Sequence, residues 1–164
     1  MKILFDTSVL VAALVQPHPL HHRALSWLKK AKAEEFELIV SSHTIAELYA
    51  VLSTLPVSPR ITPGLAWRLI HESVEPVASV ISLSSSDYFA TIKRMSDLGI
   101  SGGAVYDALI VKTARKSEVD RVLTFNVNDF KRIWPEGDAW NATPSTESPS
   151  LYLPHTLPVC LKSC

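Results

Sequence analysis

The sequence predicts an α/β fold, namely a three-layer α/β/α domain with a central, mainly parallel sheet. Its 164 residues contain short apolar runs rich in β-branched side chains, and helix-length segments separate these runs. Runs that are apolar throughout are typical of strands buried on both faces of a parallel sheet. Right-handed crossovers between such strands place helices on both faces of the sheet.

Four runs have the length and composition of such strands. They occupy residues 2–5 (KILF), 37–41 (ELIVS), 77–82 (VASVIS) and 121–125 (RVLTF). Between them apolar residues recur at helical spacing, as Leu20, Ala24 and Leu28 do in the first such segment. The segments predicted to be helices are 19–35, 44–55, 64–74, 86–99 and 103–117.

Polar side chains come at or soon after the ends of three of these strands. Asp6 directly follows the first strand, Glu47 lies in the first turn of the helix after the second, and Asn126 follows the last. In an open parallel sheet, ligands bind beyond the carboxyl ends of the strands. We therefore expect the three side chains to converge on one crevice, which accounts for an acid within the apolar opening run.

Asp107 lies in the least expected surroundings. On a helix it shares one face with Ala104, Val111 and Ala114, and this face carries no Lys or Arg. An unpaired carboxylate there would cost several kcal/mol, whereas a cation shared with the other acids would stabilise it. Oxygen donors favour Mg²⁺ or Mn²⁺ over zinc, and such a site suits phosphodiester chemistry.

Simpler interpretations exist for the polar residues at the strand ends. Asp6 could cap a helix that begins near Val9, and Thr44 with Glu47 fits a capping box. Asp129 is interpreted as a cap or turn residue rather than a ligand. Together these interpretations lose strength, because unrelated caps need not coincide with strand ends.

Composition narrows the remaining possibilities. The 16 Lys and Arg residues balance 16 Asp and Glu, which argues against a protein that coats nucleic acid through bulk charge. The histidines within residues 18–22 are interpreted as the start of an exposed helix rather than a metal site. Lys112, Arg115 and Lys116 are candidate phosphate contacts, although the outer charges of a helix are commonly only solvated.

The two ends of the chain bear on location and organisation. A secretion signal is not predicted, because Asp6 precedes a short apolar core, and no apolar run reaches the ~18 residues of a membrane helix. Cys160 and Cys164 lie far from any predicted core, which favours a reducing, cytoplasmic compartment. We expect residues 1–137 to form the domain and residues 138–164, rich in Pro, Ser and Thr, to be a disordered or loosely docked tail.

Four segments occur in an order and spacing typical of a known family. They read ILFDTSVLVAAL, SSHTIAELYAVL, GISGGAVYDALIVKTA and VLTFNVNDF, and the resemblance that they carry covers about residues 1–134. In these segments the chain resembles the PIN-domain family, in particular its VapC-type toxin ribonucleases. The resemblance implies a metal-dependent endoribonuclease that acts on RNA, forms a homodimer and pairs with a small antitoxin inserted into its active groove.

The resemblance also implies roles for individual residues. The catalytic residues and the ligands of Mg²⁺ or Mn²⁺ are expected to be Asp6, Glu47, Asp107 and Asn126. The hydroxyl groups that would position water, substrate or the acids are those of Thr7, Ser8 and Thr124. Family members often have Asp where this chain has Asn126, so a second metal position is expected to be weaker here or left to substrate phosphate and water. Asp129, three residues on, could compensate for the missing charge instead of only capping a helix.

Two other functions remain open from the sequence. A non-catalytic module of the same fold would bind a partner protein or nucleic acid without binding divalent cations. A phosphatase that works through an aspartyl-phosphate needs a second Asp two residues after Asp6, where this chain has Ser8. We therefore expect a Mg²⁺- or Mn²⁺-dependent ribonuclease that is the toxin of a type II toxin–antitoxin pair.

Overall fold

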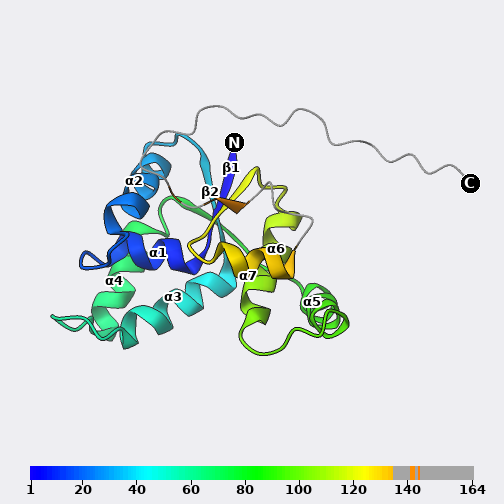
Figure 1. The fold of residues 1–164 in the computed structure, drawn as a ribbon. Coiled ribbons are helices and arrows are strands. Elements are labelled where there is room, and N and C mark those ends of the chain that lie inside the picture. The colour runs from blue at the N-terminus through cyan, green and yellow to red at the C-terminus, as the bar shows by residue number, and fades with distance from the viewer. Residues whose placement is uncertain (135–140, 143, 145–164) are drawn as a thin grey trace, which may run out of the picture.

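A five-stranded parallel sheet with strand order β3-β2-β1-β4-β5 forms the centre of the molecule, and helices pack on both of its faces (Figure 1). This computed structural model describes residues 1–134, 141, 142 and 144, and only the backbone of 141 and 142. The predicted three-layer α/β/α architecture is confirmed. Most of the predicted tail, including Cys160 and Cys164, lies outside the described residues.

The strands agree with the prediction most closely at the centre of the sheet. They are β1 (Lys2–Phe5), β2 (Glu37–Ser41), β3 (Ala78–Ile81), β4 (Arg121–Leu123) and β5 (Asn141–Ala142). Strand β4 ends before Thr124, whose hydroxyl accepts a hydrogen bond from the backbone N–H of Asn126 at 2.9 Å and so turns the chain. Strand β5 was not predicted, because two residues carry no periodicity.

Strand β3 is partly exposed. The prediction that it is buried on both faces is therefore wrong. Ser79 is exposed and the side chain of Val80 is 46% exposed. Strand β3 lies at one edge of the sheet, where it pairs with β2. An edge strand is less fully covered than a central one, and β-branched composition does not distinguish the two.

The five predicted helices are present, with bounds that differ by a few residues, and two further helices flank them. They are α1 (Thr7–Leu14), α2 (His21–Lys32), α3 (Ser42–Thr54), α4 (Pro63–Ser73), α5 (Ser85–Asp97), α6 (Ala104–Lys116) and α7 (Val127–Ile133). Helix α1 has no amphipathic pattern because six of its eight residues are buried. A helix that is apolar on all sides gives no periodic signal in the sequence.

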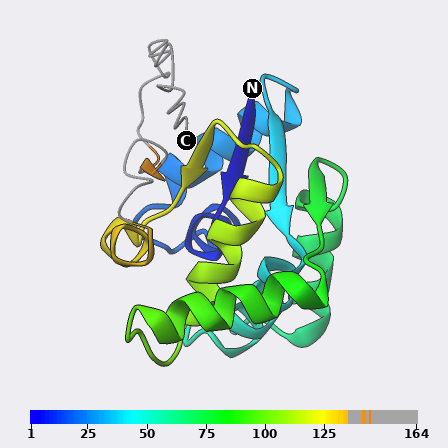
Figure 2. The ribbon, with the colours of Figure 1, turned by 90° about the vertical axis from the view of Figure 1, so that its right-hand side faces the viewer.

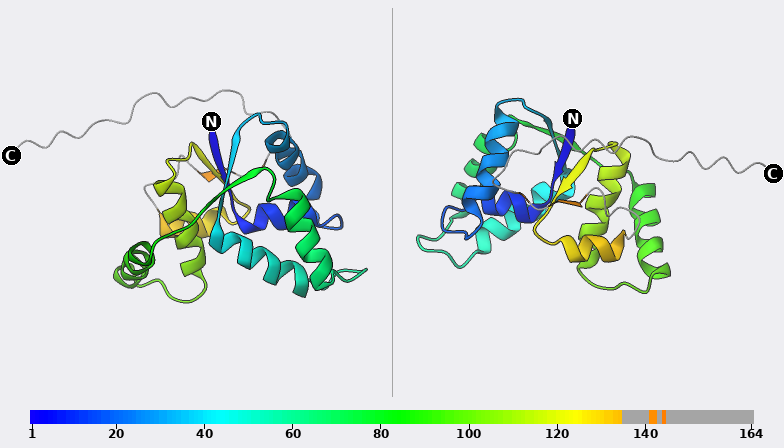
Figure 3. Two further views of the ribbon diagram at one scale, coloured as in Figure 1. Left: turned by 180° about the vertical axis from the view of Figure 1, so that it is seen from behind. Right: turned by 45° about the horizontal axis from the view of Figure 1, so that its top comes forward.

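Alternating side chains of the central strands form two cores. Ile3 and Phe5 of β1 pack with α1 to α4, whereas Leu4 packs with α5, α6 and α7. Figure 2 shows α6 in front of the strands with α1 and α2 behind them, and Figure 3 shows the two groups of helices on opposite sides. Among the described helices, none has the length and apolar character needed to span a bilayer.

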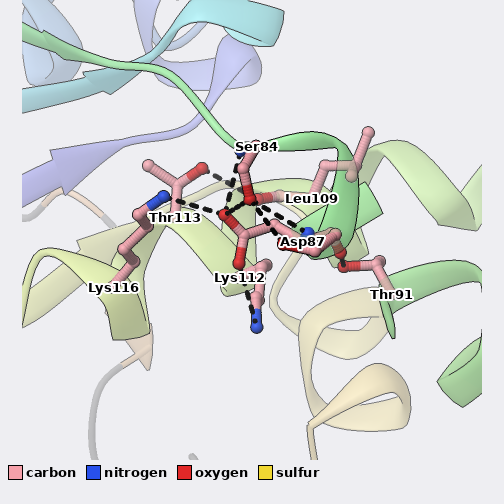
Figure 4. Close-up of polar contacts among 8 residues, drawn as sticks. Ser84, Asp87, Thr91, Leu109, Lys112, Thr113 and Lys116 are labelled. Carbon is pink, nitrogen blue, oxygen red and sulfur yellow. Dashed lines mark hydrogen bonds and ion pairs between the residues drawn. The ribbon is translucent and has the colours of Figure 1, made fainter. Parts of the chain in front are cut away.

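A polar cluster joins α5 to α6 around Asp87 (Figure 4). Asp87 Oδ2 accepts a 2.8 Å hydrogen bond from Lys116 Nζ, Lys112 Nζ lies 3.3 Å from Oδ1, and Ser84 completes a capping box. These contacts, led by that of Lys116, hold the pKa of Asp87 well below its usual range. Two of the three candidate phosphate contacts are therefore engaged by an acid.

Arg115, the third candidate phosphate contact, is engaged as well. Its guanidinium lies 4.0 Å from the centre of the Trp134 ring, which is a cation–π contact that fixes α7 against α6. The cations at the C-terminal end of α6 thus serve packing between helices in this structure.

Candidate active site

A cavity of about 360 Å³ opens where β1 and the turn after β4 meet the helices α1, α3 and α6. Its lining includes the four polar residues that the sequence placed at one crevice, namely Asp6, Glu47, Asp107 and Asn126. Thr7 and Ser8 line it as well. Residues from four separate parts of the chain therefore border one space at the carboxyl edge of the sheet.

Asp6 is the most deeply placed of these acids, with 2% of its surface exposed. It occupies the N-cap position of α1, yet its side chain makes no capping hydrogen bond. Instead Asp6 Oδ2 accepts hydrogen bonds from Ser8 Oγ at 2.6 Å and Thr124 Oγ1 at 2.7 Å. Burial raises the pKa of Asp6, and the two hydroxyl donors oppose that rise.

The two hydroxyl groups also fix the turn between β4 and α7. Ser8 Oγ accepts a hydrogen bond from the backbone N–H of Phe125 at 3.1 Å, as Thr124 Oγ1 does from that of Asn126. Asn126 is the N-cap residue of α7, and its side chain makes no capping bond. Its backbone is therefore held in place while its amide borders the cavity.

Glu47 is held by a hydrogen bond from the start of α1. Its Oε2 accepts a 2.6 Å hydrogen bond from Thr7 Oγ1, so the first turn of α1 orients an acid of α3. The alternative of a capping box with Thr44 is wrong, because α3 begins earlier. Ser41 is its N-cap residue, and the Ser41 side chain accepts from the N–H of His43.

Asp107 lies in the first turn of α6 and is partly buried. Burial raises its pKa to about 7, and the charges of Asp6, Asp129 and Glu47 add to the rise in that order, against a lowering by Arg132. Carboxylates that repel one another in this way lie within electrostatic reach across the cavity. At neutral pH this group is poised between its two protonation states.

The oxygen donors at the cavity suit a hard divalent cation, but their side chains are not arranged as a preformed metal site. Among the side chains that the structure describes, no three His, Cys, Asp or Glu groups have an arrangement that could hold a metal ion. The donors at the cavity are carboxylate and amide oxygens, which suit Mg²⁺ or Mn²⁺. Burial and the neighbouring carboxylates raise the pKa of Asp107, and a cation among these carboxylates would relieve their repulsion.

Two residues at or near this cavity were given other main roles from the sequence, although Asp129 was also offered as a compensation for Asn126. Asp129 was interpreted as a cap, yet its charge raises the pKa of Asp107 more than that of Glu47 does. His18 lines the cavity, and its Nδ1 accepts a 3.1 Å hydrogen bond from the backbone N–H of Leu20. The exposed-helix interpretation of the histidines is wrong for His18, which precedes the helix and is partly buried.

Comparisons of sequence give consistent results. The model of a family described as the PIN domain matches residues 3–133. Ribonuclease VapC27 of Mycobacterium tuberculosis is 33% identical over 115 residues, which are 70% of this chain and 78% of that protein. Ribonuclease VapC40 of the same species is 30% identical over 110 residues, 67% of this chain and 76% of that protein.

Comparisons of structure agree with those of sequence. The crystal structure of VapC20 of Mycobacterium tuberculosis, a toxin that cleaves the sarcin-ricin loop, matches with a TM-score of 0.61 at 16% identity and covers 77% of this chain and 92% of VapC20. The structure of VapBC2 of Rickettsia felis bound to a promoter DNA fragment matches with a TM-score of 0.62 at 21% identity. The match covers 87% of this chain and 98% of the matched chain in that structure. At these identities the likeness shows a common fold.

Proposed function

This chain belongs to the PIN-domain family, and on that basis we propose that it is a divalent-metal-dependent endoribonuclease, the toxin of a toxin–antitoxin pair. One observation carries the proposal. Asp6, Glu47 and Asp107 come from distant parts of the chain and border one cavity, in which burial and mutual repulsion raise the pKa of Asp107 to about 7. The names of VapC27 and VapC40, both called ribonucleases, support RNA as the substrate.

In this proposal Asp6 and Asp107 hold the cation, and Asn126 adds its carbonyl oxygen. A bound Mg²⁺ or Mn²⁺ would supply the positive charge that activates water and screens the phosphate. Glu47 has Oε2 occupied by Thr7, which leaves Oε1 to orient the attacking water and accept its proton. Asp129 supplies the negative charge that Asn126 lacks.

The hydroxyl groups act through the acids in this proposal. Ser8 and Thr124 donate to the same oxygen of Asp6, which directs the other oxygen toward the cavity. Thr7 does the corresponding work for Glu47. Such supporting hydrogen bonds commonly matter for metal affinity, because they fix the orientation of the ligands.

A small antitoxin is the proposed protein partner. A chain of VapBC2 from Rickettsia felis has the fold of this chain, which supports a partner of this kind, and we propose that the partner covers the acidic cavity. We also propose a homodimer, and a cytoplasmic location because the substrate RNA is found there. Light scattering of the purified chain tests the dimer, and co-expression with the neighbouring open reading frame tests the partner.

Cleavage of a fluorogenic single-stranded RNA tests the central proposal. We expect cleavage with Mn²⁺ or Mg²⁺ and none with EDTA. The variants Asp6→Asn and Asp107→Asn should reduce the rate on the order of 100-fold or more, with unchanged circular dichroism. The control is Glu72→Gln, which neutralises an exposed acid of α4 and should cut as the wild type does.

Three outcomes would contradict the proposal. Both Asn variants could cut as fast as the wild type, EDTA could have no effect, or calorimetry could detect no binding of millimolar Mn²⁺. The last result would favour a non-catalytic module that binds a partner. Covalent trapping of Asp6 by a phosphate mimic would instead favour the aspartyl-phosphate phosphatase.

A further inference from the structure

Two aromatic rings from different helices stack beside the acidic cavity. The rings of His43 in α3 and Tyr106 in α6 lie nearly parallel, with centres 4.9 Å apart and an angle of 17° between their planes. The stack does not belong to either core, since 47% of the Tyr106 surface is exposed. An exposed ring held by a partner from another helix has a fixed orientation without the usual burial.

The position of the stack relates it to the site. His43 precedes Glu47 by four residues and so lies on the same face of α3, one turn nearer the helix start. Tyr106 directly precedes Asp107 in the first turn of α6, and α3 contacts α6. The stacked pair is therefore one helical turn from Glu47 and directly beside Asp107, outside the lining of the cavity that these two acids border.

A second stack in the molecule provides a contrast. Trp67 and His71 stack at 5.1 Å within α4, four residues apart, and His71 Nδ1 lies 2.7 Å from Glu75. That arrangement is an ordinary contact along one helix surface. The pair at the cavity instead joins two helices that each carry an acid of the site.

RNA binding at this acidic cavity would gain from a contact that is not an ion pair. Carboxylates repel RNA phosphates, the chain has no net charge, and the cations of α6 near its C-terminal end are engaged by Asp87 and Trp134. Aromatic rings bind unpaired bases by stacking, which needs no charge and tolerates any base. The exposed, oriented ring of Tyr106, directly before Asp107 in α6, could make such a contact.

We propose that the Tyr106–His43 stack is a platform for one nucleobase of the RNA, next to the bond that is cleaved. This inference rests on the proposed ribonuclease function and identifies a substrate contact within it. Tyr106 would bind the base and position the backbone over the acids, while His43 would hold the Tyr106 ring in its plane.

RNA binding in EDTA tests the platform without cleavage. The probe is a labelled single-stranded RNA of about eight nucleotides, followed by fluorescence anisotropy with the full chain. We expect Tyr106→Ala and Tyr106→Leu to weaken binding about 5- to 100-fold, whereas Tyr106→Phe keeps most of the affinity. Tyr49→Ala is the matched control, because Tyr49 is also an exposed tyrosine, 42% exposed, and should bind as the wild type does.

An abasic scan of the RNA separates stacking from an indirect effect on folding. Removing the base that contacts Tyr106 should weaken binding to the wild type but not to Tyr106→Ala, and this lack of additivity identifies the contact. Two results would refute the platform: Tyr106→Leu binds RNA as tightly as the wild type, or no abasic position weakens binding to the wild type more than to Tyr106→Ala. An effect of the variant on binding of a protein partner would not rescue it.

Failure of the platform and failure of the ribonuclease proposal give different results. If the wild type cleaves RNA, and Tyr106→Ala cleaves it with the same rate and KM, only the platform proposal is refuted. If the wild type binds RNA through Tyr106 but does not cleave it with Mn²⁺, the ribonuclease proposal is refuted and the contact with RNA remains.

Discussion

Thr124 and Asp6 are 118 residues apart in the chain, and the Thr124 hydroxyl donates a 2.7 Å hydrogen bond to Asp6 Oδ2. The same hydroxyl accepts from the backbone N–H of Asn126 at 2.9 Å, and Thr124 is fully buried. One side chain thus links the deepest acid of the cavity to the turn that presents Asn126.

The variant Thr124→Val tests this link because valine has the same shape without the hydroxyl. It leaves the N–H of Asn126 without its acceptor and Asp6 without one donor, so we expect a loss of about 1–3 kcal/mol in the free energy of unfolding. Urea unfolding measures the loss, and Mn²⁺ calorimetry should show weaker binding. Thr124→Ser retains the hydroxyl and is the control. Equal stability and equal Mn²⁺ affinity in the two variants would show that the hydroxyl has no role.

Thr7 should affect catalysis through Glu47 and leave folding largely intact. In Thr7→Val the 2.6 Å hydrogen bond to Glu47 Oε2 is lost, and the carboxylate becomes free to change rotamer. We expect kcat to fall about 10-fold with KM nearly unchanged. A double-mutant cycle checks the route, because Thr7→Val should have little further effect in a Glu47→Gln background. Additive losses would mean that Thr7 acts elsewhere.

The location of the acids could be predicted from sequence because parallel strands end at one edge of a sheet. Asp6 and Asn126 follow strands, and Asp107 interrupts an apolar helix face, so their positions depend on periodicity alone. The hydrogen bonds that orient these groups are different in kind. Thr124 and Asp6 are far apart in the sequence, and no local sequence pattern predicts a hydrogen bond between them.

The residues that sequence misplaced show the same limit. Asp129 has the local pattern of a cap, and its effect on Asp107 arises only when α7 packs beside α6. His18 lies in the turns between α1 and α2, and its place in the cavity depends on how these two helices meet. The sequence of strand β3 predicts burial on both faces, because composition does not indicate which strand lies at the edge of a sheet.

Asp87 should stabilise the packing of α5 on α6 at neutral pH and lose this effect in acid. Its pKa is lowered in the folded state, so its contribution is present above the ordinary Asp value and is lost as pH falls through the folded value. We expect Asp87→Asn to lower the thermal midpoint at pH 7, with a difference that narrows below about pH 3.8.

Asp97→Asn is the matched control for Asp87. Asp97 pairs along α5 with Lys93 at 2.8 Å, and both side chains are largely exposed. Pairs of this kind contribute little, so this variant should change the midpoint less than Asp87→Asn does. Equal changes in the two variants would show that the contacts of Asp87 with α6 add nothing.

Asp107 should weaken the metal-free fold above neutral pH, which is the reverse of Asp87. Its pKa rises from 3.8 to about 7 on folding, so the folded state retains the proton more strongly, and stability falls as pH rises between these values. Asn resembles the neutral acid, so Asp107→Asn in EDTA should be more stable than the wild type by roughly 1–2 kcal/mol at pH 8, after discounting for solvent access, and nearly equal to it at pH 4. Urea unfolding at both pH values measures the gap. Saturating Mn²⁺ should reverse the order at pH 8, because the cation binds the wild type preferentially. Equal stability of the two proteins at pH 8 in EDTA would mean that burial and the neighbouring carboxylates do not disfavour the ionised form of Asp107 in the folded state.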